Sequence, residues 1–417
     1  MQTTRRKFIG SLLVSTAYGA TVASSAESNQ NPTYLAGLKN FKETIARLPR
    51  KSGLRIKKIE TYTVDTNLCF VKVTADDGSF GYGQVSPFDA DITATILHRK
   101  IAPFVLGADP YDFDTISDTC IEANYKYPWS FICRALCGVD TALWDLRGRR
   151  ENKSVCELLG SKPRRLPVYG SSMSRTIKPE DEARRLVQLR DSSGFKAFKI
   201  RIGKVCGHNQ DEWEGRTEAL VPTVRKAIGE KIGLLADANS CYTPEKAIEV
   251  GRMLEQYGVE HFEEPCPYWE LEWTAQVSAA LKVPVAGGEQ DNDLAQWRRM
   301  IKMKAVDIAQ PDVCYVGGLT RALRVAIMAA EAGLPCVPHS ANLSMVMIFT
   351  LHLFAAIPNA GKYVEFTIEQ NKWTENIYQP SLKVVEGSVP VPSEPGWGIL
   401  INTDLLQKAQ YKLSEKS

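Results

Sequence analysis

The chain has 417 residues, 44% of them hydrophobic and 24% charged, with a formal net charge of +3. A chain of this length can bury a large core and ordinarily divides into two or three domains. The small net charge argues against a nucleic-acid partner, and no apolar run after the N-terminus is long enough to span a bilayer.

The first residues predict an export signal. Residues 3–10 read TTRRKFIG, and a weakly apolar stretch with an Ala-rich end follows them. The paired Arg5-Arg6 resembles the twin-arginine type of signal, which exports folded proteins. We therefore expect a signal peptide over residues 1–26 and a periplasmic protein that is free of the membrane after export. A frayed basic N-terminus is the alternative.

The ten cysteines are scattered through apolar stretches without the paired spacing of a metal site. A chain that folds before export can keep its thiols as small core residues. We expect mostly free, buried thiols.

Two kinds of pattern divide the mature chain. Residues 54–74 and 80–85 read as strands and residues 91–160 as helices, which predicts an α+β domain over residues 27–163. From about residue 166, eight short apolar strands alternate with amphipathic helices: LPVYGSS, AFKIRI, IGLLADA, VEHFEE, VPVAGGE, AVDIAQPD, LPCVPHS and KYVEF. This alternation predicts a parallel (β/α) barrel over residues 164–378. A doubly wound open sheet is the alternative, but YGSSMSR lacks its Gly-rich phosphate turn. Residues 379–417 are expected to return to the first domain.

The predicted barrel strands end in ionisable side chains, at the edge where such barrels carry their chemistry. In chain order these are Lys199 with Arg201, Asp237 with Asn239, Glu263 with Glu264, Glu289, Asp312, His339 and Glu365. Carboxylates that converge on one rim would repel each other unless a cation joined them.

Three of these acids follow a constant spacing. Asp237, Glu263 and Glu289 are 26 residues apart each time (263 − 237 and 289 − 263). One acid per consecutive βα unit places three carboxylates on one side of the barrel mouth. Oxygen ligands without His or Cys favour a hard cation, and Mg²⁺ more than Zn²⁺.

Asp312 and His339 end the sixth and seventh predicted strands. A carboxylate bonded to an imidazole fixes the tautomer of the ring and raises its basicity, which suits a general base or acid. We therefore expect a His–Asp dyad opposite the metal site.

The motifs resemble the enolase superfamily, in the mandelate racemase branch. The resemblance rests on KIRIG, LLADANS, HFEEP, VPVAGGE, QPDVCYVGG and CVPHSAN, in this order, and on GVDTALWDLRGRR before them. It implies a modified (β/α)₇β TIM-type barrel with an α+β capping domain that the C-terminal segment completes. It also implies a lyase or isomerase acting on a small carboxylate, without nucleic-acid or membrane partners. Relatives are commonly homo-oligomers, so we expect one here.

Carried over to this sequence, the resemblance makes Asp237, Glu263 and Glu289 the Mg²⁺ ligands, with Glu264 as their neighbour. Asn239 and Glu365 would contact the substrate, and His339 with Asp312 would form the dyad. The family removes the proton alpha to a carboxylate through an enediolate. That proton is weakly acidic, so its removal needs a cation on the developing oxyanion and a base close to the carbon.

The sequence departs from the family pattern at one position. The usual Lys-x-Lys tip, whose second lysine is a base, is Lys199-x-Arg201 here. Arginine is effectively never deprotonated, which argues against a two-base racemase. The departure favours dehydration of a sugar acid to a 2-keto-3-deoxy acid, with His339 as the catalytic group and Lys199 and Arg201 as cationic clamps on the substrate.

Several alternatives stay open. An anti elimination would need a second acid, and His208 in the loop 203–216 could supply it; otherwise this loop is a solvated turn. An epimerase, racemase or cycloisomerase on a carboxylate sugar is the rival activity. A catalytically silent periplasmic binder of sugar acids is the alternative from another class.

Overall fold

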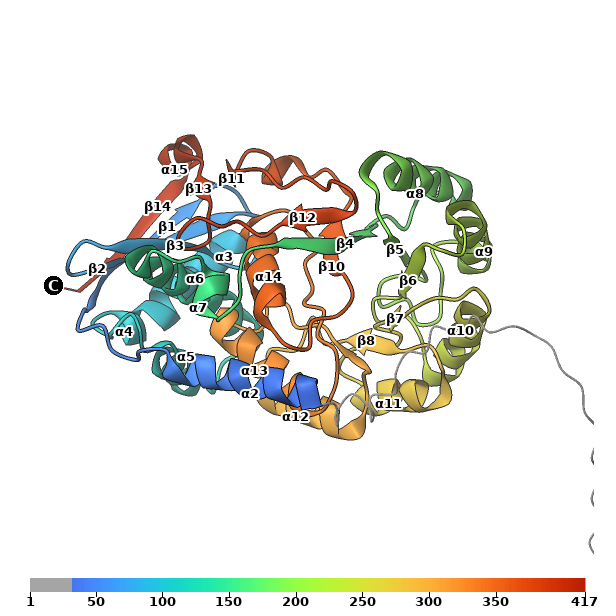
Figure 1. Ribbon diagram of the computed structural model, residues 1–417, viewed down its shortest axis with the longest axis horizontal. Helices are drawn as coiled ribbons and strands as arrows, with labels where there is room; N and C mark the ends of the chain where they lie inside the picture. The colour runs from blue at the N-terminus through green and yellow to red at the C-terminus, as the bar shows by residue number, and fades with distance from the viewer. Residues whose placement is uncertain (1–31, 417) are drawn as a thin grey trace, which may run out of the picture.

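The computed structural model describes residues 32–416, which form a mixed α/β protein with a capping domain and a parallel-strand barrel (Figure 1). This is the predicted fold class. The predicted signal peptide, residues 1–26, lies outside the described residues. Among residues 32–416, no helix has both the length and the apolar character that crossing a membrane requires.

An antiparallel sheet forms one side of the capping domain, in the order β14-β1-β2-β3. Its strands are β1 (Ile56–Thr63), β2 (Cys69–Ala75), β3 (Phe80–Gln84) and β14 (Gln410–Glu415). The first three follow one another as a meander, as the alternating sequence predicts. The fourth comes from the other end of the chain and pairs with β1 from Lys58↔Glu415 to Thr63↔Gln410.

Helices pack on one face of this sheet and on one another. They are α3 (Ala90–Ile96), the π-helical turn η1 (Leu97–Ile101), α4 (Ala102–Val105), α5 (Phe113–Ala123), α6 (Trp129–Glu151) and α7 (Val155–Leu158). The longest, α6, is buried along most of its length. It packs against β3 at two glycines, because a Cβ on Gly81 or Gly83 would overlap the α6 backbone. An earlier helix, α2 (Pro32–Arg47), was not predicted; its Tyr34 donates a hydrogen bond to the carbonyl oxygen of Ala330.

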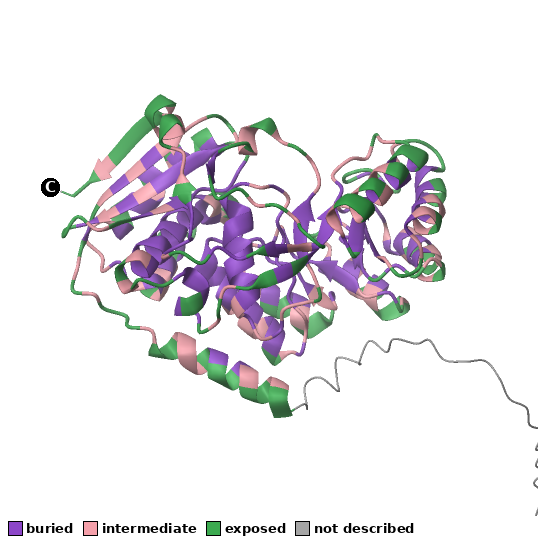
Figure 2. Ribbon diagram, turned by 45° about the horizontal axis from the view of Figure 1, so that its top comes forward, coloured by how far each residue is buried: buried purple, intermediate pink, exposed green. Residues whose placement is uncertain are grey.

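The barrel strands are parallel and neighbour one another in chain order from β4 to β9, with β10 beside β4. They are β4 (Arg165–Ser171), β5 (Ala197–Arg201), β6 (Gly233–Asp237), β7 (Phe262–Glu263), β8 (Val285–Gly287), β9 (Ile308–Ala309) and β10 (Val364–Thr367). The helices between them are α8 (Pro179–Ser193), α9 (Arg216–Ile228), α10 (Pro244–Gln256), α11 (Leu271–Ala280), α12 (Leu294–Met303), α13 (Leu319–Glu331) and α14 (Met345–Ala356). Helices α8 to α12 have exposed residues on their outer sides, whereas α14 is buried along nearly its whole length, as are strands β5 to β8 and β10 (Figure 2).

The prediction of a regular seventh strand in LPCVPHS was wrong. Residues 334–340 make only isolated bridges, Ala309↔Cys336, Asp312↔His339 and Cys336↔Ala360. Pro335 and Pro338 carry no N–H and cannot donate to a ladder, which explains why the pairing is broken. The Asp312↔His339 bridge nevertheless fixes the relative height of these two residues.

After β10 the chain returns toward the capping domain. The short elements on this path are η2 (Lys372–Thr374), β11 (Tyr378–Gln379), β12 (Ser388–Pro390), β13 (Leu400–Ile401) and α15 (Thr403–Lys408). Strand β12 pairs with β4, and β11 pairs with β13.

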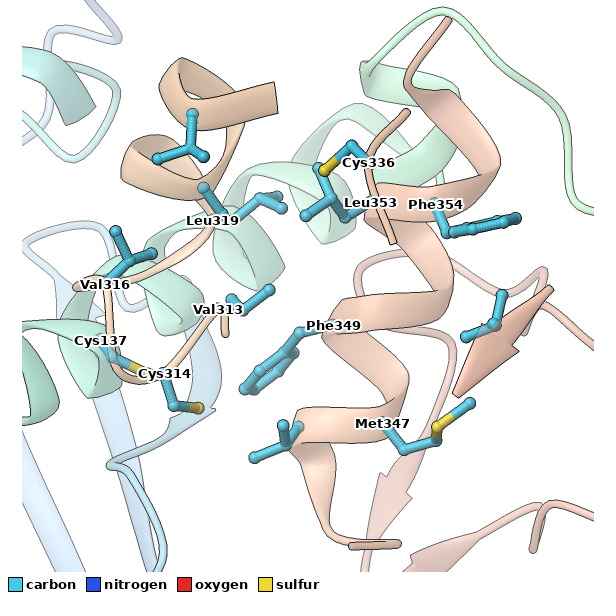
Figure 3. Close-up of a cluster of buried hydrophobic side chains, with 14 of the residues drawn as sticks. Cys137, Val313, Cys314, Val316, Leu319, Cys336, Met347, Phe349, Leu353 and Phe354 are labelled. Carbon is cyan, nitrogen blue, oxygen red and sulfur yellow. The ribbon is translucent and has the colours of Figure 1, made fainter. Parts of the chain in front are cut away.

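The two domains share one hydrophobic core. Cys137 of α6 faces Cys314 in the segment between β9 and α13, and Phe349 of α14 packs nearby (Figure 3). All ten cysteines are free thiols; nine are buried and Cys206 is exposed. The expectation of mostly free, buried thiols is therefore confirmed.

Candidate active site

The strand register gathers charged residues at the barrel mouth. Arg201 lies opposite Asp237, and Asp237 lies opposite Glu263, across β5, β6 and β7. Glu289 follows the end of β8 by two residues. Parallel strands end at the same rim, so local βα connections suffice to bring these four side chains together, and all four are buried.

Lys199 lies at the centre of the acids and is fully buried. Its Nζ is 2.6 Å from Oε1 of Glu263 and 2.7 Å from Oε1 of Glu365, and Oδ2 of Asp237 is 3.5 Å away. Burial lowers the pKa of this amine, but the carboxylates outweigh burial and hold the pKa well above its usual value. Lys199 is therefore a fixed positive charge.

Arg201 is held from three sides. Its guanidinium forms an ion pair with Asp237, and it donates hydrogen bonds to the carbonyl oxygen of Ser172 (2.9 Å) and to Oδ1 of Asn239 (2.9 Å). Burial lowers the pKa of the guanidinium, but Asp237 and the other acids raise it by a larger amount, so the net shift is upward. A group in this state cannot accept a proton from a carbon acid. Arg175 donates to the same Asn239 oxygen at 2.6 Å.

The two glutamates of the EEP motif, Glu263 and Glu264, have pKa values shifted in opposite directions. Burial raises the pKa of Glu263, but Lys199 and its other cationic neighbours outweigh burial and hold the pKa well below normal. Nε2 of Gln310 donates to Oε2 of Glu263 at 2.8 Å. Burial and the nearby acids, Glu289 first, raise the pKa of Glu264 well above normal. Oε1 of Glu264 is buried without a hydrogen-bond partner among the described residues.

His339 lies between acids on the opposite side. Its Nδ1 is 2.8 Å from Oδ2 of Asp312, and its Nε2 is 3.3 Å from Oε2 of Glu289 and 4.0 Å from Oε2 of Glu365. Oδ1 of Asp312 accepts backbone N–H bonds from Cys314 and Tyr315, which fixes the carboxylate. Burial lowers the pKa of His339, but Glu289, Glu365 and Asp312 outweigh it and raise the pKa to about 10.

Glu365 of β10 connects the lysine side to the histidine side. Beyond Lys199, its oxygens accept hydrogen bonds from Oγ of Ser171 (2.7 Å) and from the backbone N–H of Ser340 (2.9 Å). Burial raises the pKa of Glu365, but Lys199 and His339 outweigh burial and lower the pKa to about 2. It is therefore a fixed negative charge between the two candidate catalytic groups.

The predicted metal ligands are close together but paired with cations. In residues 32–416 no three His, Cys, Asp or Glu side chains stand in an arrangement that could hold a metal ion. Asp237 faces Arg201, Glu263 faces Lys199, and Glu289 faces His339. The donors still fit Mg²⁺: they are all carboxylates, and burial together with neighbouring acids raises the pKa of both Asp237 and Glu289. A divalent cation would relieve this repulsion.

Among the described residues, no hydrogen bond or ion pair joins His208 to this cluster. The loop that carries it packs on the β6–α10 connection, where Cys206 donates its N–H to the carbonyl oxygen of Asn239 and Asn209 donates to that of Cys241. Between these anchors His208 has a left-handed backbone (φ 49°) and an exposed side chain. Asn209 and the residues after it line a surface cavity of about 380 Å³ against α10.

Sequence reasoning missed several polar residues around the cluster. Arg175 follows β4, and Gln310 stands inside the quoted QPD motif, so both had a positional signal. Tyr169, inside β4, is buried, and its hydroxyl has no hydrogen-bond partner in the described part of the chain. Nζ of Lys199 lies 5.6 Å from its ring centroid. Arg134 comes from the capping domain, and no strand-end rule could have found it.

Two family models match the chain. One is described as mandelate racemase / muconate lactonizing enzyme, N-terminal domain, and covers residues 48–160; the other is enolase C-terminal domain-like and covers residues 181–405. An arabinonate dehydratase from Saccharolobus solfataricus is 29% identical over 87% of this chain and 95% of its own. A D-galactarolactone cycloisomerase from Agrobacterium fabrum is 31% identical over 81% of this chain and 89% of its own.

Solved structures agree with these matches. A racemase candidate from Roseobacter denitrificans is 52% identical, with a TM-score of 0.85 over 87% of this chain and 100% of its own. An L-talarate dehydratase from Polaromonas sp. JS666, crystallised with Mg and L-glucarate, is 25% identical, with a TM-score of 0.76 over 87% of this chain and 100% of its own.

Proposed function

We propose that this chain, which belongs to the mandelate racemase/muconate lactonizing enzyme family of the enolase superfamily, is a Mg²⁺-dependent dehydratase of a sugar acid. Its relatives include sugar-acid dehydratases and a cycloisomerase, which supports an enzyme acting on a small carboxylate. The observation that carries the proposal is the asymmetry of the site: one side offers a buried arginine bound to Asp237, and the other offers a histidine bound to Asp312.

Each residue has a defined role in this reaction. Asp237, Glu263 and Glu289 would hold Mg²⁺, which supplies positive charge for the substrate carboxylate and the developing enediolate. Lys199 and Arg201 add fixed positive charge on the same side. His339 removes the alpha proton in its neutral form through Nε2, because Asp312 occupies Nδ1. Neutralising the charge of Glu289, the acid that raises the pKa of His339 most, would favour that neutral form. The beta C–O bond then breaks, and the same ring returns its proton to the leaving hydroxyl as water forms. Tautomerisation of the enol gives the 2-keto-3-deoxy acid.

Cycloisomerisation is the second candidate, and two similar proteins favour it: the Agrobacterium fabrum enzyme and a 3,6-anhydro-D-galactonate cycloisomerase from Zobellia galactanivorans, 28% identical. It uses the same first step, but the beta C–O bond that then breaks belongs to the substrate's own ring, so the ring opens and no water is lost. Epimerisation needs a second base, and Arg201 opposes that role. A silent binder would retain affinity for sugar acids without turnover.

The test is incubation of the protein and Mg²⁺ with a library of sugar acids and lactones in D₂O. Formation of 2-keto-3-deoxy acids supports the proposal. Deuterium at the alpha carbon with no dehydration product, or ring opening of a lactone without net water loss, would assign the alternatives. Thermal shifts with no product from any substrate would leave only the binder.

We also propose a periplasmic location by the twin-arginine route and a homo-oligomeric assembly. The thiols support export of a folded chain, because none of the ten forms a disulfide. Replacing Arg5 and Arg6 by Lys should retain the protein in the cytoplasmic fraction. Light scattering of the mature chain measures its oligomeric state.

A further inference from the structure

Arg134 is a cation of the capping domain that the reaction above does not use. It lies in the first turns of α6 and is half-buried. Its guanidinium carbon stands 3.6 Å from the ring centroid of Tyr315, and its NH1 donates a 2.6 Å hydrogen bond to Oγ of Ser86. Stacking on one face and a hydrogen bond at one edge hold the guanidinium still, which leaves its other N–H groups available.

Within residues 32–416, no Asp or Glu oxygen comes within 4.0 Å of a nitrogen of Arg134, although many other arginines of the chain form ion pairs. Its hydrogen bond to Ser86 is a neutral contact and does not compensate the charge. A fixed, half-buried guanidinium without a protein carboxylate is suited to an anion from outside the chain.

Arg134 lies near the reacting side of the site. The Tyr315 ring that it covers is 6.0 Å from the His339 ring, centroid to centroid. The guanidinium carbon is therefore at most 9.6 Å from the imidazole centroid, the sum of 3.6 Å and 6.0 Å. Arg134 thus lies where the capping domain contacts the barrel, on the His339 side of the site.

We propose that Arg134 binds a second anionic group at the far end of the substrate, which makes the substrate a sugar di-acid or a phosphorylated sugar acid rather than a simple mono-acid. The inference rests on the proposed function. A six-carbon chain with single bonds of about 1.5 Å spans roughly 6 Å, and polar contacts add about 3 Å at each end. It is long enough to place one alpha carbon at His339 and the opposite terminal anion at Arg134.

The experiment compares kcat/KM for matched six-carbon substrates that differ only at C6: a carboxylate, a phosphate ester or a free hydroxyl. The variants are Arg134→Met and Arg134→Lys, with Arg150→Met at the other end of α6 as the control. Loss of a two-pronged charged contact predicts a fall of roughly 10- to 100-fold for the substrate with the second anion. The mono-acid should change little. Arg134→Lys should retain part of the preference, and Arg150→Met all of it.

Each outcome decides something. A fall of equal size for all three substrates would mean that Arg134 only positions Tyr315 against His339, and would overturn the inference. A wild-type preference for the mono-acid would overturn it too, while the dehydratase proposal survives. If no substrate is turned over, the proposed function fails. Calorimetry in the presence of Mg²⁺ then measures the binding of each acid and tests the Arg134 subsite independently of turnover. If Arg134→Met binds the di-acid or the phosphorylated acid more weakly than the wild-type protein does, the inference is supported. Equal binding to the wild-type protein and the variant rejects it.

Discussion

The two sides of the site differ in which residue can exchange a proton. Arg201 is bound to Asp237, to the carbonyl oxygen of Ser172 and to Asn239, so its charge and its position are both fixed. His339 has one nitrogen bound to Asp312 and the other facing Glu289 and Glu365. Only the second nitrogen is free of the bond to Asp312 and can exchange a proton with a substrate, which gives the reaction a single face.

Replacing His339 by Gln should reduce kcat by about 10²- to 10⁴-fold, since this is the usual contribution of a positioned general acid or base. Mg²⁺ affinity, measured by calorimetry, should be largely retained. His208→Asn is the matched control, and because His208 is exposed we expect unchanged turnover. A comparable loss of turnover in His208→Asn would show that the loop 203–216 takes part in the reaction.

Arg201→Lys tests whether the reaction is one-sided because position 201 cannot exchange a proton. A lysine at this position restores a group that can lose its proton, although it lacks the fork that contacts both Ser172 and Asn239. We expect slower dehydration together with new exchange of an alpha proton of the opposite configuration. Proton NMR in D₂O follows that exchange. Dehydration at the wild-type rate with no exchange would contradict this account of Arg201.

At the scale of elements, close packing of β3 on α6 sets the position of the capping domain. The two glycines of FGYGQ make the approach possible because they have no Cβ. Helix α6 also carries Arg134 and Cys137, so the same contact positions the proposed substrate anchor and the shared core. A shift of α6 would therefore displace both Arg134 and the part of the shared core that contains Cys137.

Gly83→Ala should destabilise the protein by about 1–3 kcal/mol, since its Cβ would overlap Gly138 and Ala142 of α6. Gly37→Ala in α2 is the opposite case: outside the helix's own backbone, no atom of residues 32–416 lies within 4 Å of the added Cβ. There the helix should gain roughly 0.5–1 kcal/mol. Urea unfolding measures both. Equal stability of the two variants would refute the proposed tight contact.

The elements also show how far sequence patterns reach. Alternating and helical periodicities located the barrel units, because each pattern reports the local burial of one element. The motif order identified the family, which the family models confirm. Periodicity did not find that β14 would pair with β1, since that contact joins the two ends of the chain. It also missed Arg134, whose approach to Tyr315 depends on how two domains meet. In LPCVPHS the apolar residues predicted a strand that the prolines break.

At the scale of the whole molecule, His352 connects the barrel to the capping domain and to the C-terminal segment. Its Nδ1 accepts a hydrogen bond from the backbone N–H of Cys156 (3.1 Å), and its Nε2 donates to the carbonyl oxygen of Trp397 (3.2 Å). It thus ties α14 of the barrel to α7 and to the returning C-terminal segment. Both contacts require the neutral ring with its proton on Nε2, because a proton on Nδ1 would break the first.

Burial lowers the pKa of His352 from 6.5 to about 4. The folded pKa lies below the unfolded one, so unfolding takes up a proton and stability falls as the pH drops from about 6.5 to about 4. The full loss is on the order of 3 kcal/mol. In His352→Asn, urea unfolding should show lower stability at pH 7 and a weaker pH dependence below 6.5. His98 acts in the same direction, so part of the dependence should remain. An unchanged slope would exclude His352 as its source.

The pairing of β14 with β1 also sets an order in time. The register joins residues near position 60 to residues near position 412, so the first strand of the capping sheet lacks this neighbour until almost the whole chain has left the ribosome. Contacts this distant in sequence form slowly, because the intervening chain must already be compact. During synthesis the barrel can begin to assemble while the capping sheet keeps an open edge, and the last strand closes it.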